Sequence, residues 1–162
     1  MPTSQRQKDV CDMLDADHKA VKKMFKDFDS LCGSKARGAA QSRLDLAREI
    51  CVELTVHAQV EEEIFYPALR SAIKETDLIA EAEVEHQTAK DLIAQIQAAE
   101  TADEEFNAKV KVLGEYIDHH VKEERNEIFP KARSARKLDL VAMRDDAEAR
   151  KQELMDEQLA TA

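Results

Sequence analysis

Apolar residues recur every three or four positions along four long stretches of the chain. This spacing lines one face of an α-helix, whereas a half-buried strand would need strict alternation. The stretches cover about residues 5–31, 39–74, 76–98 and 103–130. A fifth stretch, at about residues 139–159, is richer in charge and poorer in apolar positions. The pattern predicts an all-α protein with four core helices and an additional C-terminal helix.

Short polar connections separate these stretches, and short connections make consecutive helices antiparallel. We therefore expect residues 1–135 to form an up-down-up-down four-helix bundle. Residues 136–162 should form an amphipathic helix that packs on the bundle or mediates self-association. Within the second stretch, Pro67 predicts a kink or local break near residues 60–63, because proline lacks an N–H and its ring disturbs the preceding turn.

Polar residues interrupt the apolar faces in an order that occurs twice. The second stretch has a histidine, then a glutamate and a proline, and the fourth stretch repeats them at the same spacing. The first and third stretches each carry a histidine preceded by acidic residues. The residues concerned are His57, Glu61 and Pro67; His120, Glu124 and Pro130; and the separate His18 and His86. A polar group present twice in one small domain indicates a symmetric site.

The histidines and glutamates of this repeat lie where an ordinary bundle would bury apolar side chains. An isolated buried carboxylate loses its hydration or takes up a proton, and two together also repel each other. A metal ion removes this cost, because it pairs with the carboxylates and accepts the lone pairs of the imidazoles. Imidazole and carboxylate together suit iron or manganese, with zinc possible, better than magnesium or calcium.

The candidate ligands divide evenly between two metal ions. Residues i and i+4 share one helical face, so each glutamate of the repeat can reach the same point as the histidine one turn before it. The predicted ligands are His18 and His57 for one metal, His86 and His120 for the other, and Glu61 and Glu124 as bridges. This arrangement leaves positions free for a bridging oxygen and a small exogenous ligand.

The ordered set of motifs resembles the hemerythrin-like (HHE cation-binding) domain family over roughly residues 9–133. The resemblance implies a four-helix bundle that holds two iron ions with a bridging oxo or hydroxo group; manganese or zinc is less favoured. It also implies O2, peroxide or nitric oxide as the small ligand, for sensing, detoxification or the handling of iron and oxygen. Catalase-like or oxidase activity is compatible with such a centre.

The chain departs from the oxygen-carrying members of that family in the third helix. Those proteins have a second histidine one turn away, where this chain has Ala82 and Lys90. The departure argues against simple reversible oxygen carriage. Glu62 or Glu123 could replace the missing ligand, although a solvated charge is the simpler interpretation of both.

Other polar neighbours of the candidate ligands allow two interpretations each. Asp15 and Glu83 lie three residues before the histidines of the first and third stretches. They either orient those imidazoles through the second ring nitrogen or remain surface charges. Tyr116 has a role beside the metal or one in core packing. His119 is expected at the flank of the bundle or on its surface.

Two further functions fit parts of the sequence. The spacing of Asp15 and Glu83 to the following histidines also matches the carboxylate-x-x-His signature of ferritin-like di-iron ferroxidases and oxygenases. That interpretation leaves His57 and His120 without a role. Alternatively, the metal only stabilises a regulatory or interaction module, and the C-terminal helix binds a partner.

Charge and cysteine content limit the partners and the cellular location that we expect. The formal net charge of −10 argues against nucleic acid or an anionic membrane as a partner. No apolar run approaches the roughly 20 residues of a membrane span, and the first residues lack the apolar core of a signal peptide. Three scattered cysteines fit a reduced cytoplasmic setting better than a disulfide framework. We expect a monomer or a homodimer.

Overall fold

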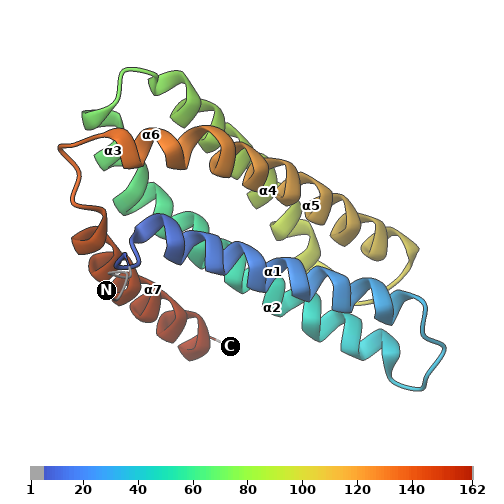
Figure 1. Ribbon diagram of the computed structural model, residues 1–162. Coiled ribbons are helices and arrows are strands. Elements are labelled where there is room, and N and C mark those ends of the chain that lie inside the picture. The colour runs from blue at the N-terminus through green and yellow to red at the C-terminus, as the bar shows by residue number, and fades with distance from the viewer. Residues whose placement is uncertain (1–5, 162) are drawn as a thin grey trace, which may run out of the picture.

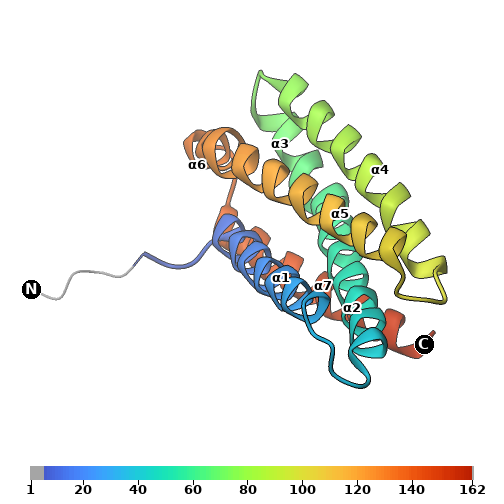
Figure 2. The same cartoon turned by 90° about the vertical axis from the view of Figure 1, so that its right-hand side faces the viewer.

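The computed structural model describes residues 6–161, and Figure 1 shows that part of the chain as a bundle of helices without strands. The long helices of the bundle are α1 (Val10–Cys32), α2 (Ala39–Val60), α4 (Thr76–Ala98) and α5 (Glu104–Glu123). α1 and α4 each contact both α2 and α5, so the four helices close into a ring. Consecutive helices of the ring run in opposite directions (Figure 1, Figure 2). The predicted all-α, up-down-up-down bundle is confirmed.

α2 and α5 each continue through a widened π-helical turn into a short helix. The turns are η1 (Glu61–Phe65) and η2 (Glu124–Ile128), and the short helices are α3 (Tyr66–Ala72) and α6 (Phe129–Ser134). In η1 the N–H of Tyr66 donates to the carbonyl of Glu61, five residues earlier. Pro67 follows directly and has no N–H to donate, which favours the wider turn. The disruption predicted near residues 60–63 is therefore a π turn that begins at Glu61.

The π turns determine which side chains face the interior of the bundle. In such a turn, residues i and i+5 lie on one face, whereas an α-helix aligns i with i+4. Glu61 and Tyr66 are both buried as a result, and so are Glu124 and Phe129 at the corresponding positions of η2 and α6. Each turn thus directs a carboxylate and an aromatic ring towards the interior of the bundle.

The C-terminal helix α7 (Leu140–Ala160) lies outside the ring, along α1 and α2 (Figure 1). It also contacts η1, and its buried residues are Met143, Ala147 and Leu154. Among residues 6–161, every helix is too short or too polar to cross a membrane.

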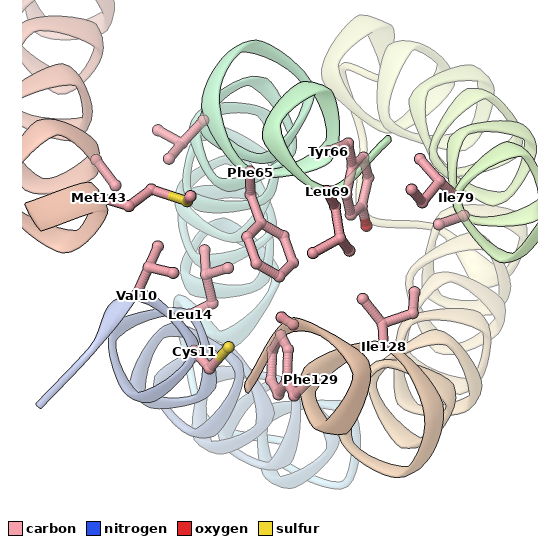
Figure 3. Packing of buried hydrophobic residues seen from close by; sticks show 14 of the residues in the cluster. Val10, Cys11, Leu14, Phe65, Tyr66, Leu69, Ile79, Ile128, Phe129 and Met143 are labelled. Atoms are coloured by element: carbon pink, nitrogen blue, oxygen red, sulfur yellow. The ribbon is translucent and has the colours of Figure 1, made fainter. Parts of the chain in front are cut away.

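Two apolar clusters occupy the two ends of the bundle interior. Figure 3 shows the one near α3, α6 and α7, where Leu14, Phe65 and Phe129 pack together. The other cluster lies towards the opposite end and includes Val21 and Phe106. Because Leu14 and Val21 belong to different clusters, the α1 residues between them form a layer that neither cluster fills. That layer contains the polar site.

Candidate metal centre

The six predicted ligands converge in one buried layer between the two apolar clusters. Each of the four long helices contributes one histidine, and each π turn contributes its first residue, a glutamate. The histidines are at most 8% exposed, and both glutamates are completely buried. The residues are His18, His57, His86 and His120, with Glu61 and Glu124.

Each glutamate lies between histidines from opposite halves of the layer. Glu61 Oε1 is 2.8 Å from His57 Nε2 and 3.5 Å from His86 Nε2. This places one carboxylate oxygen within reach of both halves, as a bridging ligand requires.

Glu124 repeats the arrangement with the other two histidines. Its Oε1 is 3.2 Å from His18 Nε2 and 3.3 Å from His120 Nε2. His18 and His57 also approach each other, with 3.0 Å between their Nε2 atoms. Their ligand atoms form one compact group with both glutamates, while His86, His120 and Glu61 form a second. The structure thus places His18 beside His57 and His86 beside His120.

Several buried polar atoms of this layer have no hydrogen bond of acceptable geometry. They include both carboxylate oxygens of Glu61, Oε1 of Glu124 and Nε2 of His120. Buried polar atoms are almost always paired, because an unpaired one keeps the full cost of its lost hydration. Cations placed among these atoms would pair with the carboxylates and accept the imidazole nitrogens. The donor set therefore fits bound metal ions.

The second ring nitrogens of two histidines face carboxylates on neighbouring helices. His57 Nδ1 is 3.1 Å from Asp17 Oδ2, and His120 Nδ1 is 3.2 Å from Glu85 Oε1. Such contacts fix the orientation and tautomer of a ligating imidazole. Asp17 directly precedes His18, and Glu85 directly precedes His86. Each carboxylate points towards the neighbouring helix, where it reaches the histidine of that helix.

Asp15 and Glu83, which either orient His18 and His86 or remain surface charges, both pair with arginines. Glu83 is half-buried and accepts a hydrogen bond from Arg70 at 3.0 Å, as the surface-charge alternative expects. Asp15 lies 3.9 Å from the Nδ1 of His18 and is bound by Arg125 instead. Position i−3 lies on the outer side of each helix here, which explains both outcomes.

Tyr66, for which the sequence predicts no role, lies beside the candidate ligands, and so does Glu62, whose expected roles were a replacement ligand or a solvated charge. The hydroxyl of Tyr66 donates to Glu124 Oε2 at 3.2 Å and is 3.4 Å from His86 Nε2. Glu62 accepts from Lys90 at 2.6 Å and lies 3.6 Å from His86 Nδ1. The π turn conceals Tyr66 from a search at α-helical spacing.

Two other candidates lie away from this layer. Tyr116 is half-buried, and within the described chain it makes no hydrogen bond to a candidate ligand. His119 is exposed, with its Nε2 3.1 Å from Glu123, in agreement with the expected surface position. Glu123 and Glu85 form a small outer group with His119.

Without metal, protonated histidines pair with the carboxylates of the site. Burial lowers the pKa of His57, but Glu61 and Asp17 outweigh it and raise the pKa to about 10. Burial likewise lowers the pKa of His120, and Glu124 and Glu85 raise it to about 11. Burial raises the pKa of Glu61, yet the neighbouring histidines bring it well below its ordinary value. Imidazolium–carboxylate pairs therefore occupy the places where metal would bind.

A small cavity of about 30 Å³ borders the Nε2 layer. All four histidines contribute to its wall. The rest of the wall is mainly apolar and includes Leu54, Ile93, Ile117 and Val121. A space of this size accommodates a water molecule or a small ligand of two or three atoms.

Comparisons with known proteins agree with this geometry. Residues 9–132 match the family model described as the hemerythrin HHE cation binding domain. A DNA nickase from Nostoc sp. (strain PCC 7120) is 29% identical over 125 residues, which are 77% of this chain and 34% of the nickase. The chain therefore spans about a third of the length of that curated relative.

A solved structure shares the fold. The crystal structure of a hemerythrin HHE cation binding domain-containing protein from Mycobacterium kansasii superimposes with a TM-score of 0.77. The match covers 95% of this chain and 91% of that protein, at 22% sequence identity.

Proposed function

Because the chain belongs to the hemerythrin HHE cation-binding domain family, we propose that its buried layer holds two iron ions that bind or react with O2, peroxide or nitric oxide. The observation that carries the proposal is the position of Glu61 and Glu124. One oxygen of each carboxylate, Oε1, lies within 3.5 Å of histidine nitrogens from both halves. A single ion would leave one half unused, whereas two ions use every donor.

Iron agrees with the chemistry of the donors. The layer offers imidazole nitrogens and carboxylate oxygens, and both buried thiols belong to the apolar clusters instead. Nitrogen and oxygen donors without thiolate suit iron and manganese. An iron pair, when bound, would supply one-electron chemistry and open positions for a small ligand.

Tyr66 is the residue best placed to replace the ligand missing from the third helix. Its oxygen lies 3.4 Å from His86 Nε2, on the His86/His120 side. Burial raises the pKa of this phenol well above its ordinary value, and Glu124 and Glu61 raise it further. Without metal the phenol therefore stays protonated and donates a hydrogen bond to Glu124. Near a cation it offers an oxygen donor.

The remaining residues of the site orient ligands and limit what can approach. Asp17 and Glu85 hold the imidazoles of His57 and His120 by their Nδ1 atoms. The small apolar cavity excludes bulk water and admits only ligands of a few atoms. The net charge of −10 argues against DNA as a partner, although a longer relative is a nickase. The outward orientation of Glu83 also speaks against a ferritin-like set of ligands.

Metal analysis together with optical spectroscopy tests the proposal. We expect purified protein to contain two irons per chain and to show an iron charge-transfer spectrum in air that changes on adding azide, peroxide or nitric oxide. A His57→Ala, His120→Ala double variant should lose both iron and spectrum. Folded protein that binds no iron when supplied with ferrous salt under anaerobic conditions would refute the proposal.

A further inference from the structure

A surface cleft between α1 and α5 reaches the candidate metal centre. Its volume is about 290 Å³, and His18 forms part of its wall. Lys22 and Asp118 form an ion pair at 3.8 Å among the charged residues of the cleft. A larger cleft of about 950 Å³ between α1 and α7 has no candidate ligand in its wall. The α1–α5 cleft is thus the smaller of the two, yet it is the one that reaches a candidate ligand.

The cleft and the small inner cavity share three residues. His18, Ile117 and Val121 line both spaces. Ile117 and Val121 are four residues apart on α5 and so share one face of the helix. Val121 is 7% exposed and directly follows the candidate ligand His120. These two aliphatic side chains form the partition between the outer cleft and the inner cavity.

We propose that small ligands reach the metal centre through the α1–α5 cleft and that Ile117 and Val121 act as a size filter. This inference rests on the proposed function, because it gives the ligand of that centre a route. The outer space can hold a molecule of several heavy atoms, but the inner one holds only a water molecule or a ligand of two or three heavy atoms. Hydrogen peroxide, O2 and azide can pass, whereas a branched organic hydroperoxide stops in the outer cleft.

The inner cavity has another side, which sets a competing route. Thr55 of α2 and Lys90 of α4 also line it, and Lys90 is partly exposed. Glu62 holds the ammonium of Lys90 at 2.6 and 3.0 Å from its two oxygens. This ion pair keeps the lysine side chain across the α2–α4 side of the cavity. Substitutions of Ile117 or Val121 and of Lys90 can therefore open the two sides of the cavity separately.

The first test compares hydrogen peroxide with tert-butyl hydroperoxide on iron-loaded protein. The Val121→Ala and Ile117→Ala variants should raise the rate for the bulky peroxide relative to hydrogen peroxide by at least about tenfold, as expected if about 1.4 kcal/mol of steric barrier is removed. Val110→Ala is the matched control, because Val110 is a buried valine of the same helix and lines neither space. Lys90→Ala should also leave the ratio unchanged. Azide association should accelerate in the filter variants only.

The second test needs no metal. Ala89 lines the inner cavity, so Ala89→Cys places a thiol there in the metal-free protein. Iodoacetamide should modify this thiol faster in combination with Val121→Ala than with Val110→Ala or Lys90→Ala. Cys51, which is buried but outside both spaces, serves as the internal reference for local unfolding.

The outcomes separate the route from the proposed function. If the protein binds no iron but the labelling follows the expected order, the proposed function fails and the route stands. Equal labelling in the Val121→Ala and Val110→Ala backgrounds would overturn the filter, whatever the iron content. Faster labelling with Lys90→Ala alone would overturn it in favour of the α2–α4 side.

Discussion

The His18/His57 half of the centre and the His86/His120 half share one backbone plan but differ in the side chains around it. In each half, a single histidine faces a histidine that lies four residues before a glutamate, and a π turn begins at that glutamate. In each half, the residue before the single histidine, Asp17 or Glu85, holds the Nδ1 of the other imidazole. The repeat therefore determines where the ligands lie.

The aromatic residue that follows each π turn distinguishes the halves. Phe129 stacks on His18, with 6.2 Å between ring centroids and 9° between the planes. At the corresponding position, Tyr66 brings a hydroxyl to Glu124 and His86. The His18/His57 half thus has an apolar ring and borders the α1–α5 cleft, while the His86/His120 half has an additional oxygen donor. Two positions with the same backbone plan therefore offer a metal ion different surroundings.

Charge behind the imidazoles is the second difference. Lys151 of α7 binds Asp17 at 2.7 Å and so balances its charge. Glu85 instead has Glu123 beside it. Burial raises the pKa of Glu123, and the contact with Glu85 raises it further. His57 is consequently backed by a carboxylate that pairs with a lysine, whereas within residues 6–161 no lysine or arginine pairs with Glu85 behind His120.

The largest expected effect comes from removing what the halves share. Glu61→Ala deletes the oxygen that lies near both His57 and His86, so both metal ions should be lost. Metal analysis after desalting measures this loss. Glu63→Ala is the control, because Glu63 belongs to the same π turn but faces outward and binds Arg150. Retention of one ion in Glu61→Ala would show that the halves bind metal independently.

Exchanging the aromatic residues tests the first difference. Tyr66→Phe removes a donor from Glu124, and we expect loss of metal from the His86/His120 half to a chelator to accelerate by about tenfold or more. Any phenolate-to-iron band in the visible spectrum should disappear as well. Phe129→Tyr is the matched change in the other half and should leave that band in place. If Tyr66→Phe retains metal as well as the unchanged protein and has the same spectrum, Tyr66 is not a ligand.

The metal-free protein should lose stability as the pH rises. The pKa values of His57 and His120 are raised from an ordinary 6.5 to about 10 and about 11. Their stabilising contribution is therefore fully present below about pH 6.5 and lost as the pH rises through 10 to 11. Across this window the folded state binds more protons than the unfolded state, by up to one proton per histidine, so the free energy of unfolding falls as the pH rises.

Urea unfolding of metal-free protein at several pH values between neutrality and pH 10 measures this decline. His57→Gln and His120→Gln should each remove part of the slope, because each deletes one titrating imidazole. In the metal-loaded protein the slope should be much smaller, since metal binds neutral imidazole and displaces these protons. Equal slopes with and without metal would contradict the assignment of the site.

Periodicity was sufficient to predict the bundle and the six converging residues. Histidine and glutamate at seam positions must face the interior of any bundle with this pattern, so no long-range information was needed. Tyr66 was missed because the π turn advances the inward face to i+5. Asp17 and Glu85 were missed for a different reason: the search followed one helix face, whereas each carboxylate acts on the neighbouring helix. The acidic residue directly before both histidines was the available signal.

The position of α7 could not be predicted from its own sequence. Its apolar positions are few, and the contact between Lys151 and Asp17 joins residues that are 134 positions apart. Such pairs depend on how complete helices pack, which local periodicity does not encode. The contact matters nevertheless, because Asp17 holds a candidate ligand.

Lys151 therefore supplies the smallest but most specific test of the comparison between halves. Lys151→Met should leave Asp17 uncompensated, as Glu85 already is, and make His57 a stronger donor. The reduction potential of the iron-loaded protein should fall, and the rate of metal loss should change by less than about tenfold, because the residue acts through Asp17. Lys151→Arg should restore both properties. Arg150→Met removes the neighbouring cation of α7, which binds Glu63 rather than Asp17. Equal shifts in Lys151→Met and Arg150→Met would mean that α7 acts on the centre through overall charge alone.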